Sequence, residues 1–143
     1  MKLTSFCLLA SVALLFSCSP ASKMNKSLSS LYQHKWALKK IHSESYDETV
    51  TTKAFIKFNK EKGSAGGNGS CNSFGSNTVI NGNAISFSNI FSTKMYCDDV
   101  QKTENSFLKL LPTATRFEVK RKRLLLYNSD KLILEFEAEE STN

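Results

Sequence analysis

Histidine, proline and long apolar runs are scarce in this chain, which has two histidines and two prolines among 143 residues. Its longest apolar stretch, residues 6–16, is too short for a membrane-spanning helix, which needs about 20 residues. The sequence also contains no Gly-x-Ser-x-Gly elbow, no phosphate-binding glycine loop and no internal repeat. These absences argue against a spanning helix, a serine hydrolase of the elbow type and a P-loop enzyme.

The first 17 residues instead have the features of an export signal. Lys2 is positively charged, the short apolar stretch follows it, and Ser17 places a small residue directly before Cys18. This ending resembles the lipobox of bacterial lipoproteins, in which the cysteine is acylated and becomes the new N-terminus. We therefore expect a signal peptide over residues 1–17, a lipid on Cys18 and a flexible polar tether over residues 18–30. Plain secretion or a membrane anchor with a chance cysteine is the alternative.

The charge pattern bears on partners and location. The chain has a formal charge of +6, and residues 120–123 form an uninterrupted basic run. A basic balance can indicate nucleic acid, but export argues against that partner. We favour a solvated hairpin tip, and attraction to anionic lipid headgroups is the alternative. Because Ser19 is not the aspartate that retains some lipoproteins in the inner membrane, we expect the anchor to be in the outer membrane, with the protein facing the periplasm. We also expect a monomer.

Two of the four cysteines remain after Cys7 leaves with the signal and Cys18 receives the lipid. In an oxidising compartment, the pair Cys71 and Cys97 predicts a disulfide, which would stabilise the fold by roughly 3 kcal/mol. Two buried free thiols are the alternative. A zinc site is not expected, because no histidine is near either cysteine in sequence and structural zinc uses four ligands.

Alternating apolar residues from residue 35 onward indicate about eight short strands separated by turns. A polar loop is expected at residues 43–52, and a type I′ turn at Asn81-Gly82 joins two strands. The strands are expected at residues 36–41, 54–58, 64–70, 78–80, 83–87, 116–119, 124–127 and 132–136.

One helix is expected between Asp98 or Asp99, which can cap its start, and Pro112, which ends it. Its apolar stripe includes Phe107 and Leu111, which can be buried if the helix plugs one open side of a curved sheet. We therefore predict a β-rich α+β fold, a curved antiparallel sheet or small β-barrel with one packed helix. This domain is expected over residues 31–137, with a polar tail at 138–143.

Several segments follow one another in a family-specific order: Trp36-Ala37-Leu38, Gly-x-Cys-Asn, Thr-x-Met-x-Cys, the stretch from Glu104 to Leu111 and the closing Leu124-Leu125-Leu126. In this arrangement the chain resembles the META, or HslJ-type, domain of bacterial envelope proteins. The family motif commonly has glycine directly before its first cysteine, where this chain has Ser70. The matching residues are Gly69, Cys71, Asn72, Phe74, Thr93, Met95, Cys97, Glu104 and Phe107. The resemblance implies a small barrel-like fold with a packed helix, a link in some members to heat shock, stress or antibiotic tolerance, and no established enzymatic activity.

Few side chains are candidates for catalysis or metal binding. His34 and His42 are followed by Asp47, and a histidine–carboxylate pair can do acid–base chemistry or bind a metal. We interpret them instead as a polar strand end and loop. Asn68 and Asn72 lie in a glycine-rich stretch and are interpreted as turn residues, with ligand contact as the alternative.

Three aromatic residues, Phe74, Tyr96 and Tyr127, could line a groove, but aromatic residues on strands are usually core.

Because no catalytic or metal-binding pattern stands out in the sequence, we expect no enzyme, no metal and no cofactor. The function we expect is that of an envelope lipoprotein which binds a partner in stress or antibiotic tolerance. A small-ligand barrel and an inhibitor of a lysozyme-type hydrolase are the alternatives.

Overall fold

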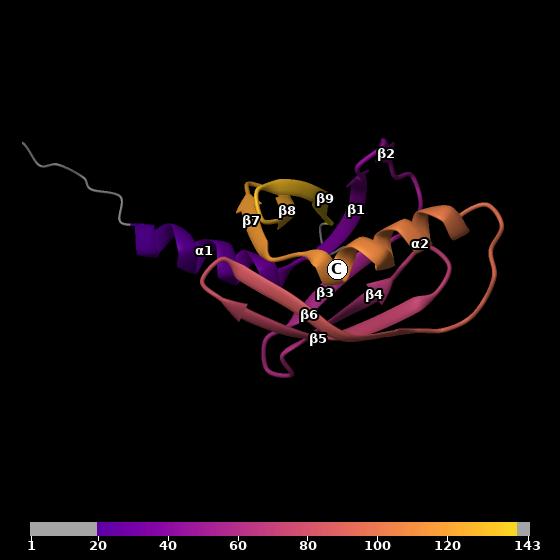
Figure 1. The fold of residues 1–143 in the computed structure, drawn as a ribbon. Helices are drawn as coiled ribbons and strands as arrows, with labels where there is room; N and C mark the ends of the chain where they lie inside the picture. Colours follow the sequence, from indigo (N-terminus) through magenta and orange to yellow (C-terminus); the bar gives the residue numbers. More distant parts are fainter. Residues whose placement is uncertain (1–19, 140–143) are drawn as a thin grey trace, which may run out of the picture.

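The computed structural model describes residues 20–139, which form a ring of antiparallel strands with helices packed on it (Figure 1). This confirms the predicted β-rich α+β fold. The helices are α1 (Pro20–Gln33), α2 (Gln101–Leu110) and a short 3₁₀ turn, η1 (Leu111–Thr113). The strands are β1 (Lys35–His42), β2 (Asp47–Thr49), β3 (Phe55–Asn59), β4 (Ser64–Asn68), β5 (Ser73–Asn81), β6 (Ala84–Ser92), β7 (Arg116–Lys120), β8 (Arg123–Asn128) and β9 (Lys131–Glu139).

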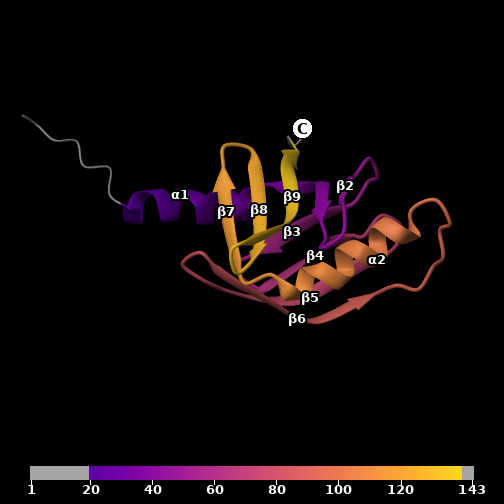
Figure 2. The ribbon, with the colours of Figure 1, turned by 45° about the horizontal axis from the view of Figure 1, so that its top comes forward.

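The sheet closes on itself, because β9 pairs with β8 on one edge and with β1 on the other. The short strand β2 pairs with the end of β1, within the stretch expected to be a loop. Closure is weakest between β6 and β7, where Ala84 and Arg116 are the one registered pair. In Figure 2, β7–β9 run across the direction of β3–β6. The fold is therefore a ring-like sheet and not an evenly hydrogen-bonded barrel.

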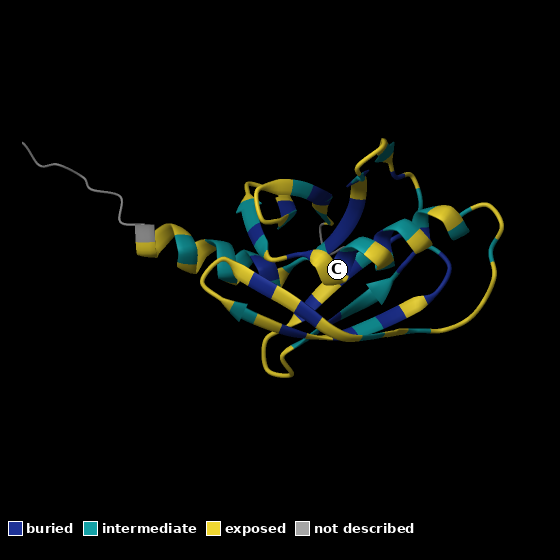
Figure 3. Ribbon diagram, viewed as in Figure 1, coloured by how far each residue is buried: buried dark blue, intermediate teal, exposed yellow. Residues whose placement is uncertain are grey.

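Large apolar side chains form the buried core of this ring. Figure 3 colours the buried residues dark blue along the ribbon. Phe107 of α2 is fully buried, and so is Leu111 directly after the helix. The Phe107 ring meets Phe74 of β5 edge-on with 5.4 Å between centroids, and Phe136 of β9 at 5.9 Å. The predicted burial of Phe107, Leu111 and Phe74 is confirmed, and α2 joins two strands that are distant in the ring.

The start of α2 differs from the prediction, whereas the α-helix ends just before Pro112 as expected. Neither Asp98 nor Asp99 caps the helix, whose N-cap is Val100 without a side-chain hydrogen bond. The backbone N–H groups of Val100 and Gln101 instead donate to the carbonyl of Cys97, at 3.2 and 2.9 Å. At the other end Pro112 lies within η1, because the first turn of a helical segment has no internal partner for the N–H that proline lacks.

The hairpin between β5 and β6 is confirmed, but its turn is displaced by one residue. Asn81 pairs with Ala84, so Gly82 and Asn83 are the two central residues. Gly82 has φ +60°, whereas Asn83 is not among the residues with positive φ. A type I′ turn needs positive φ at both positions and a type II′ turn needs glycine at the first. The observed pattern therefore fits type II′, and the predicted type I′ turn is wrong.

Helix α1 corrects the expected flexible tether, of which residues 20–30 are described. Leu28, Leu31 and Tyr32 have the i, i+3, i+4 spacing of an apolar helix face, and they pack on the core with Leu31 fully buried. The Trp36 indole N–H donates to the Leu31 carbonyl at 2.9 Å, which satisfies a carbonyl at the helix end. Apolar burial and this hydrogen bond explain why the segment is ordered as a helix.

Both ends of the chain extend past these elements. β9 continues to Glu139, so the first residues of the expected polar tail are strand, with Ala138 opposite Trp36. Residues 1–19, including Cys18 and the expected signal peptide, and residues 140–143 lie outside the described part of the chain. Within residues 20–139, no helix has the length and apolar character to cross a bilayer.

Candidate functional site

Most motif residues meet beside α2, where two loops approach the helix at the buried side chain of Glu104. We call Gly69, Cys71, Asn72, Thr93, Met95, Cys97 and Glu104 the motif cluster. The loop between β4 and β5 contributes the first three, the loop after β6 the next three, and α2 contributes Glu104. Phe74 and Phe107 lie in the core, where their rings are in contact. The structure therefore brings together residues that the sequence presents as separate motifs.

Glu104 is the centre of the cluster and is only 3% exposed. Its Oε2 accepts hydrogen bonds from the backbone N–H groups of Cys71 at 3.0 Å and Asn72 at 2.6 Å. Its Oε1 accepts a third from the Asn72 side-chain amide at 2.6 Å. A buried carboxylate without such partners would be strongly destabilising. Glu104 therefore fixes the backbone of the β4–β5 loop.

The same contacts set the protonation state of Glu104. Burial alone raises the pKa of this carboxyl, because it disfavours the charged form. Hydrogen bonds from the Asn72 side chain, the Asn72 and Cys71 backbone and Gln101 outweigh burial, so the pKa lies below its ordinary value. Glu104 is thus an anion that accepts hydrogen bonds, which is the opposite of a general acid with a raised pKa.

Asn72 is 2% exposed and connects Glu104 with the loop after β6. Its Oδ1 accepts hydrogen bonds from Thr93 Oγ1 at 2.8 Å and from the Met95 N–H at 2.7 Å. Its amide also donates to the Met95 carbonyl at 2.8 Å. The interpretation of Asn72 as a local turn residue missed these long-range bonds. Asn68 fits that interpretation better, because its Oδ1 accepts from the N–H of Ser70 at 2.9 Å.

A disulfide joins Cys71 and Cys97, as the sequence predicts, with 5.9 Å between the Cα atoms. It links the same two loops that Asn72 links by hydrogen bonds. The segment from Thr93 to Cys97 is therefore held at both ends, although it has no regular secondary structure.

Gly69 and Ser70, which precede Cys71, are both at positions that favour glycine. A Cβ on Gly69 would lie 2.8 Å from Glu104 Oε2, so a side chain there would push the carboxylate away. Ser70 has φ +132°, a region that favours glycine. The family motif commonly has glycine at this position, so the structure explains that preference. Here the Ser70 hydroxyl forms a hydrogen bond with Thr52 Oγ1 at 2.7 Å.

Three large apolar side chains are exposed in the segment from Thr93 to Cys97 and at the end of β6. Phe91, Met95 and Tyr96 are 70%, 60% and 76% exposed, and we call these three side chains the apolar ridge. The Phe91 ring covers Gly75, where a Cβ would approach its Cζ to 2.5 Å. A hollow of about 560 Å³ next to the ridge is lined by Phe91, Met95, Asn72 and residues of α2. The expectation that Tyr96 belongs to the core is wrong, because its segment leaves the sheet after β6.

Tyr127 and the two histidines have structural surroundings. Tyr127 is half-buried, with the Arg116 guanidinium carbon 3.9 Å from its ring centroid. His42 contacts Asp47 Oδ1 through Nδ1 at 2.9 Å and Glu135 Oε1 through Nε2 at 2.8 Å. It thereby connects β1, β2 and β9. Within residues 20–139, no three His, Cys, Asp or Glu side chains form a group that could hold a metal.

His34 packs edge-on against Trp36, with 5.4 Å between ring centroids.

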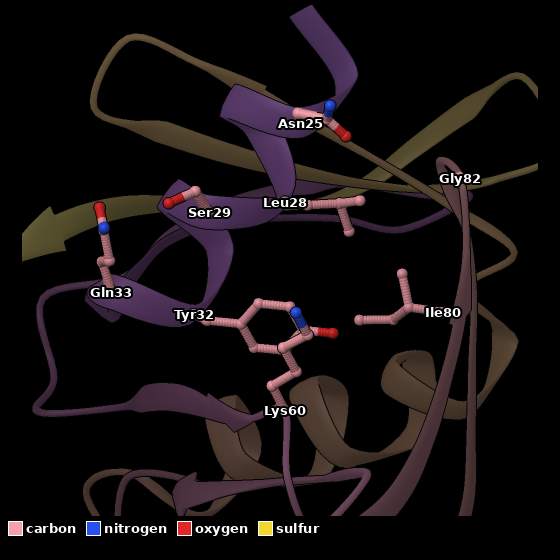
Figure 4. Close-up of a pocket in the computed structure, with 8 residues that line it drawn as sticks. All are labelled: Asn25, Leu28, Ser29, Tyr32, Gln33, Lys60, Ile80 and Gly82. Carbon is pink, nitrogen blue, oxygen red and sulfur yellow. The ribbon is translucent and has the colours of Figure 1, made fainter. Parts of the chain in front are cut away.

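A second hollow, of about 490 Å³, lies between α1 and the β5–β6 hairpin (Figure 4). Leu28 and Tyr32 of α1 face Ile80 across it, and Lys60 lies at its edge. Burial raises the pKa of the Tyr32 phenol. This hollow marks the seam where α1 packs on the sheet, and the motif residues lie elsewhere.

Solved structures of other proteins share this fold. The structure is similar to an NMR structure of a protein from Burkholderia xenovorans, with a TM-score of 0.66, 17% identity and coverage of 96% of this chain and 99% of that one. A second NMR structure matches with a TM-score of 0.59 and 17% identity, over 80% of this chain and 97% of that one. These likenesses concern the fold.

At the sequence level, no curated protein matches the chain. The META domain family matches residues 29–141, which include the whole motif cluster. The chain therefore belongs to the META domain family.

Proposed function

We propose that this protein is a non-catalytic lipoprotein that binds another protein of the bacterial envelope through its apolar ridge. Cys18 would carry the lipid in the outer membrane, and the domain would face the periplasm. The family resemblance suggests that this binding matters in stress or antibiotic tolerance. The observation that carries the proposal is that Met95 and Tyr96 are exposed on a segment whose backbone is fixed, next to the exposed Phe91 at the end of strand β6.

Exposed apolar side chains that stand together often mark an interaction surface. A flexible loop would lose conformational entropy on binding, and that loss weakens affinity. Here the Asn72 amide and the Cys71–Cys97 disulfide already hold the segment that presents Met95 and Tyr96. The ridge therefore combines apolar area with a pre-formed backbone, which is the property expected of a binding surface.

The polar groups below the ridge favour binding over catalysis. Glu104 and Asn72 are almost fully buried, and their hydrogen bonds are directed to each other and to the two loops. A catalytic carboxylate needs to reach a substrate proton or a reacting atom. The lowered pKa of Glu104 also keeps it charged near neutral pH, as a structural acceptor requires.

The alternatives have less support. A ligand-binding barrel needs interior space, but Trp36, Phe117 and Phe136 fill the inside of this ring and are at most 1% exposed. Inhibition of a lysozyme-type hydrolase would be a special case of partner binding. The positive net charge disfavours a basic target of that kind.

Site-specific photocrosslinking in the producing bacterium tests the proposal. A photoreactive amino acid would replace Met95 in one strain and Val79 in a control strain, since Val79 is 67% exposed on β5 and lies outside the ridge. We expect a discrete protein adduct from position 95, stronger under heat or antibiotic stress, and none from position 79. Equal adducts from both positions, or none from position 95, would contradict the proposal.

The lipid anchor needs a separate measurement. The intact mass of protein purified from membranes should correspond to a chain that begins at an acylated Cys18. Alkylation without reductant should leave Cys71 and Cys97 unmodified, and both should react after reduction. An N-terminus elsewhere, without acyl chains, would contradict the anchor but leave the crosslinking result valid.

A further inference from the structure

The basic run of residues 120–123 forms the exposed tip of the β7–β8 hairpin. Lys120 pairs with Arg123, and the turn between them is closed by Arg121 at φ +58°. All four side chains are exposed. The predicted hairpin tip is therefore confirmed. Other basic side chains lie next to it.

Helix α1 brings further positive charge to this tip. Lys23 and Lys26 are exposed on α1, and they line a surface hollow of about 350 Å³ together with Arg121 and Val119. Almost the whole length of the domain separates these two segments in sequence. We call Lys23, Lys26 and residues 120–123 the basic end.

Nearby carboxylates neutralise only part of this charge. Glu118 contacts Lys120 at 2.6 Å and Arg116 at 2.7 Å, and Glu137 lies opposite Arg123 in the sheet. Among residues 20–139, Lys23, Lys26 and Arg121 form no ion pair within 4 Å. Within the described part of the chain, the charges of these three side chains around one hollow are therefore uncompensated.

The position of Cys18 in the chain places this surface close to the anchor. Cys18 precedes Pro20 by two residues, and a chain extends at most about 3.6 Å per residue, so their Cα atoms are within about 7 Å. Lys26 lies about 9 Å along the helix axis from Pro20, at about 1.5 Å per residue. Attraction between a basic group and an anionic membrane surface acts over a Debye length of about 8–10 Å. The Cα atoms of Cys18 and Lys26 are thus at most about 16 Å apart. If α1 lies along the membrane surface, a lipid on Cys18 would bring the lysines of α1 within a Debye length of the headgroups.

We propose that the basic end binds the anionic phospholipid headgroups of the membrane that holds the anchor, and so orients the domain on that membrane. This inference rests on the proposed lipid on Cys18. Each basic side chain near an anionic surface strengthens binding by about fivefold. In the bound orientation the β7–β8 tip and the start of α1 face the headgroups.

Protection of the hairpin tip from trypsin tests this orientation. The membrane-purified protein would be reconstituted in phosphatidylcholine vesicles with or without phosphatidylglycerol. Cleavage at residues 120–123 would be compared with cleavage at Lys60 and Lys62, exposed in the β3–β4 turn of the same molecule. We expect cleavage at the tip to slow about tenfold on phosphatidylglycerol vesicles at low salt, and to recover at high salt. Equal rates on both kinds of vesicle would overturn the inference.

Two variants with the same change in charge show whether protection of the tip depends on the basic end or on the net charge of the protein. Lys23→Glu with Lys26→Glu should abolish most of the protection and leaves every trypsin site at the tip unchanged. Lys53→Glu with Lys57→Glu makes the same charge change at exposed positions outside the basic end and should leave protection intact. Equal loss of protection in both variants would contradict a defined surface. Equal protection of the tip by inorganic phosphate alone would contradict a membrane ligand.

The mass of the N-terminus, read from the same sample, keeps the two proposals apart. An unacylated protein whose tip is still protected by added phosphatidylglycerol vesicles would refute the anchor and support the surface. An acylated protein with an unprotected tip would support the anchor and refute the binding of headgroups by the basic end.

Discussion

The motif cluster and the basic end use polar side chains in opposite ways. In the cluster, Glu104 and Asn72 are buried and their hydrogen bonds hold two loops to α2. At the basic end, Lys23, Lys26 and Arg121 are exposed and contribute little to holding the fold together. Buried polar groups are energetically demanding and become structural, whereas exposed charges remain available to a partner surface. Substitutions at the two sites should therefore separate stability from binding.

Replacing Glu104 should have the largest effect on stability. Glu104→Ala would leave the N–H groups of Cys71 and Asn72 and the Asn72 amide without their acceptor. We expect a loss of about 4 kcal/mol in the free energy of unfolding, because several buried donors lose a charged partner together. Urea denaturation measures this loss. Glu137→Ala, at an exposed position, is the control, and a loss below about 1 kcal/mol for Glu104→Ala would contradict the structural role.

The pH dependence of stability should report the same carboxylate. The folded-state pKa of Glu104 is lowered, so its stabilising contribution is complete above the ordinary glutamate pKa of about 4.3 and is lost as the pH falls through the lowered value. The pKa of Glu118 is lowered too, chiefly by the Lys120 hydrogen bond, and adds to this slope. In acid titrations of stability, Glu104→Gln should have a shallower slope than the parent, while Glu137→Gln should match it.

Removing the disulfide should cause the next largest loss of stability. Cys71→Ala with Cys97→Ala should reduce the free energy of unfolding by about 3 kcal/mol, since the bond closes a loop of sequence separation 26. Amide hydrogen exchange at Met95 and Tyr96 should also accelerate, because the segment from Thr93 to Cys97 would lose its covalent tether to Cys71 and keep only hydrogen bonds such as those to Asn72. An exchange rate at Met95 unchanged from the oxidised parent would show that the hydrogen bonds suffice and that the disulfide does not shape the ridge.

Residue spacing predicted much of the fold and part of the cluster. Period-two alternation identified β3, whose residues Ala54, Ile56 and Phe58 are all buried at or next to the strand, and the cysteine count identified the disulfide. Spacing alone does not reveal the role of Glu104, because its partners come from a loop distant in sequence. Only the resemblance to the META family placed Glu104 among the motif residues.

Helix α1 was missed for a different reason. Its polar composition suggested a tether, although Leu28, Leu31 and Tyr32 already have helical spacing. A short amphipathic segment is stable only when a tertiary surface covers its apolar face, and sequence alone does not show whether that surface exists. The exposed Tyr96 illustrates the reverse error, because an aromatic residue was assigned to the core without a strand to carry it there.

A gain of stability should come from Ser70→Gly. Ser70 has φ +132°, where a side chain is strained by about 1–3 kcal/mol and glycine is not. Greater freedom of glycine in the unfolded chain and loss of the hydrogen bond to Thr52 offset part of this gain. We expect a net increase of about 0.5–1 kcal/mol, measurable as a Tm higher by a few degrees. Ser73→Gly, on an exposed strand position nearby, is the control and should destabilise the protein.

Substitutions at the basic end should change stability the least. Their result most directly tests the contrast between the motif cluster and the basic end. Lys23→Glu with Lys26→Glu alters two exposed side chains that form no ion pair with described residues, so the free energy of unfolding should change by less than about 0.5 kcal/mol. The same variant should lose the protection of the hairpin tip on anionic vesicles. If it unfolded as readily as Glu104→Ala, the lysines would be structural and the division between the two sites would fail. A stable variant that no longer responds to phosphatidylglycerol would show that these charges contribute to membrane contact and hardly to folding.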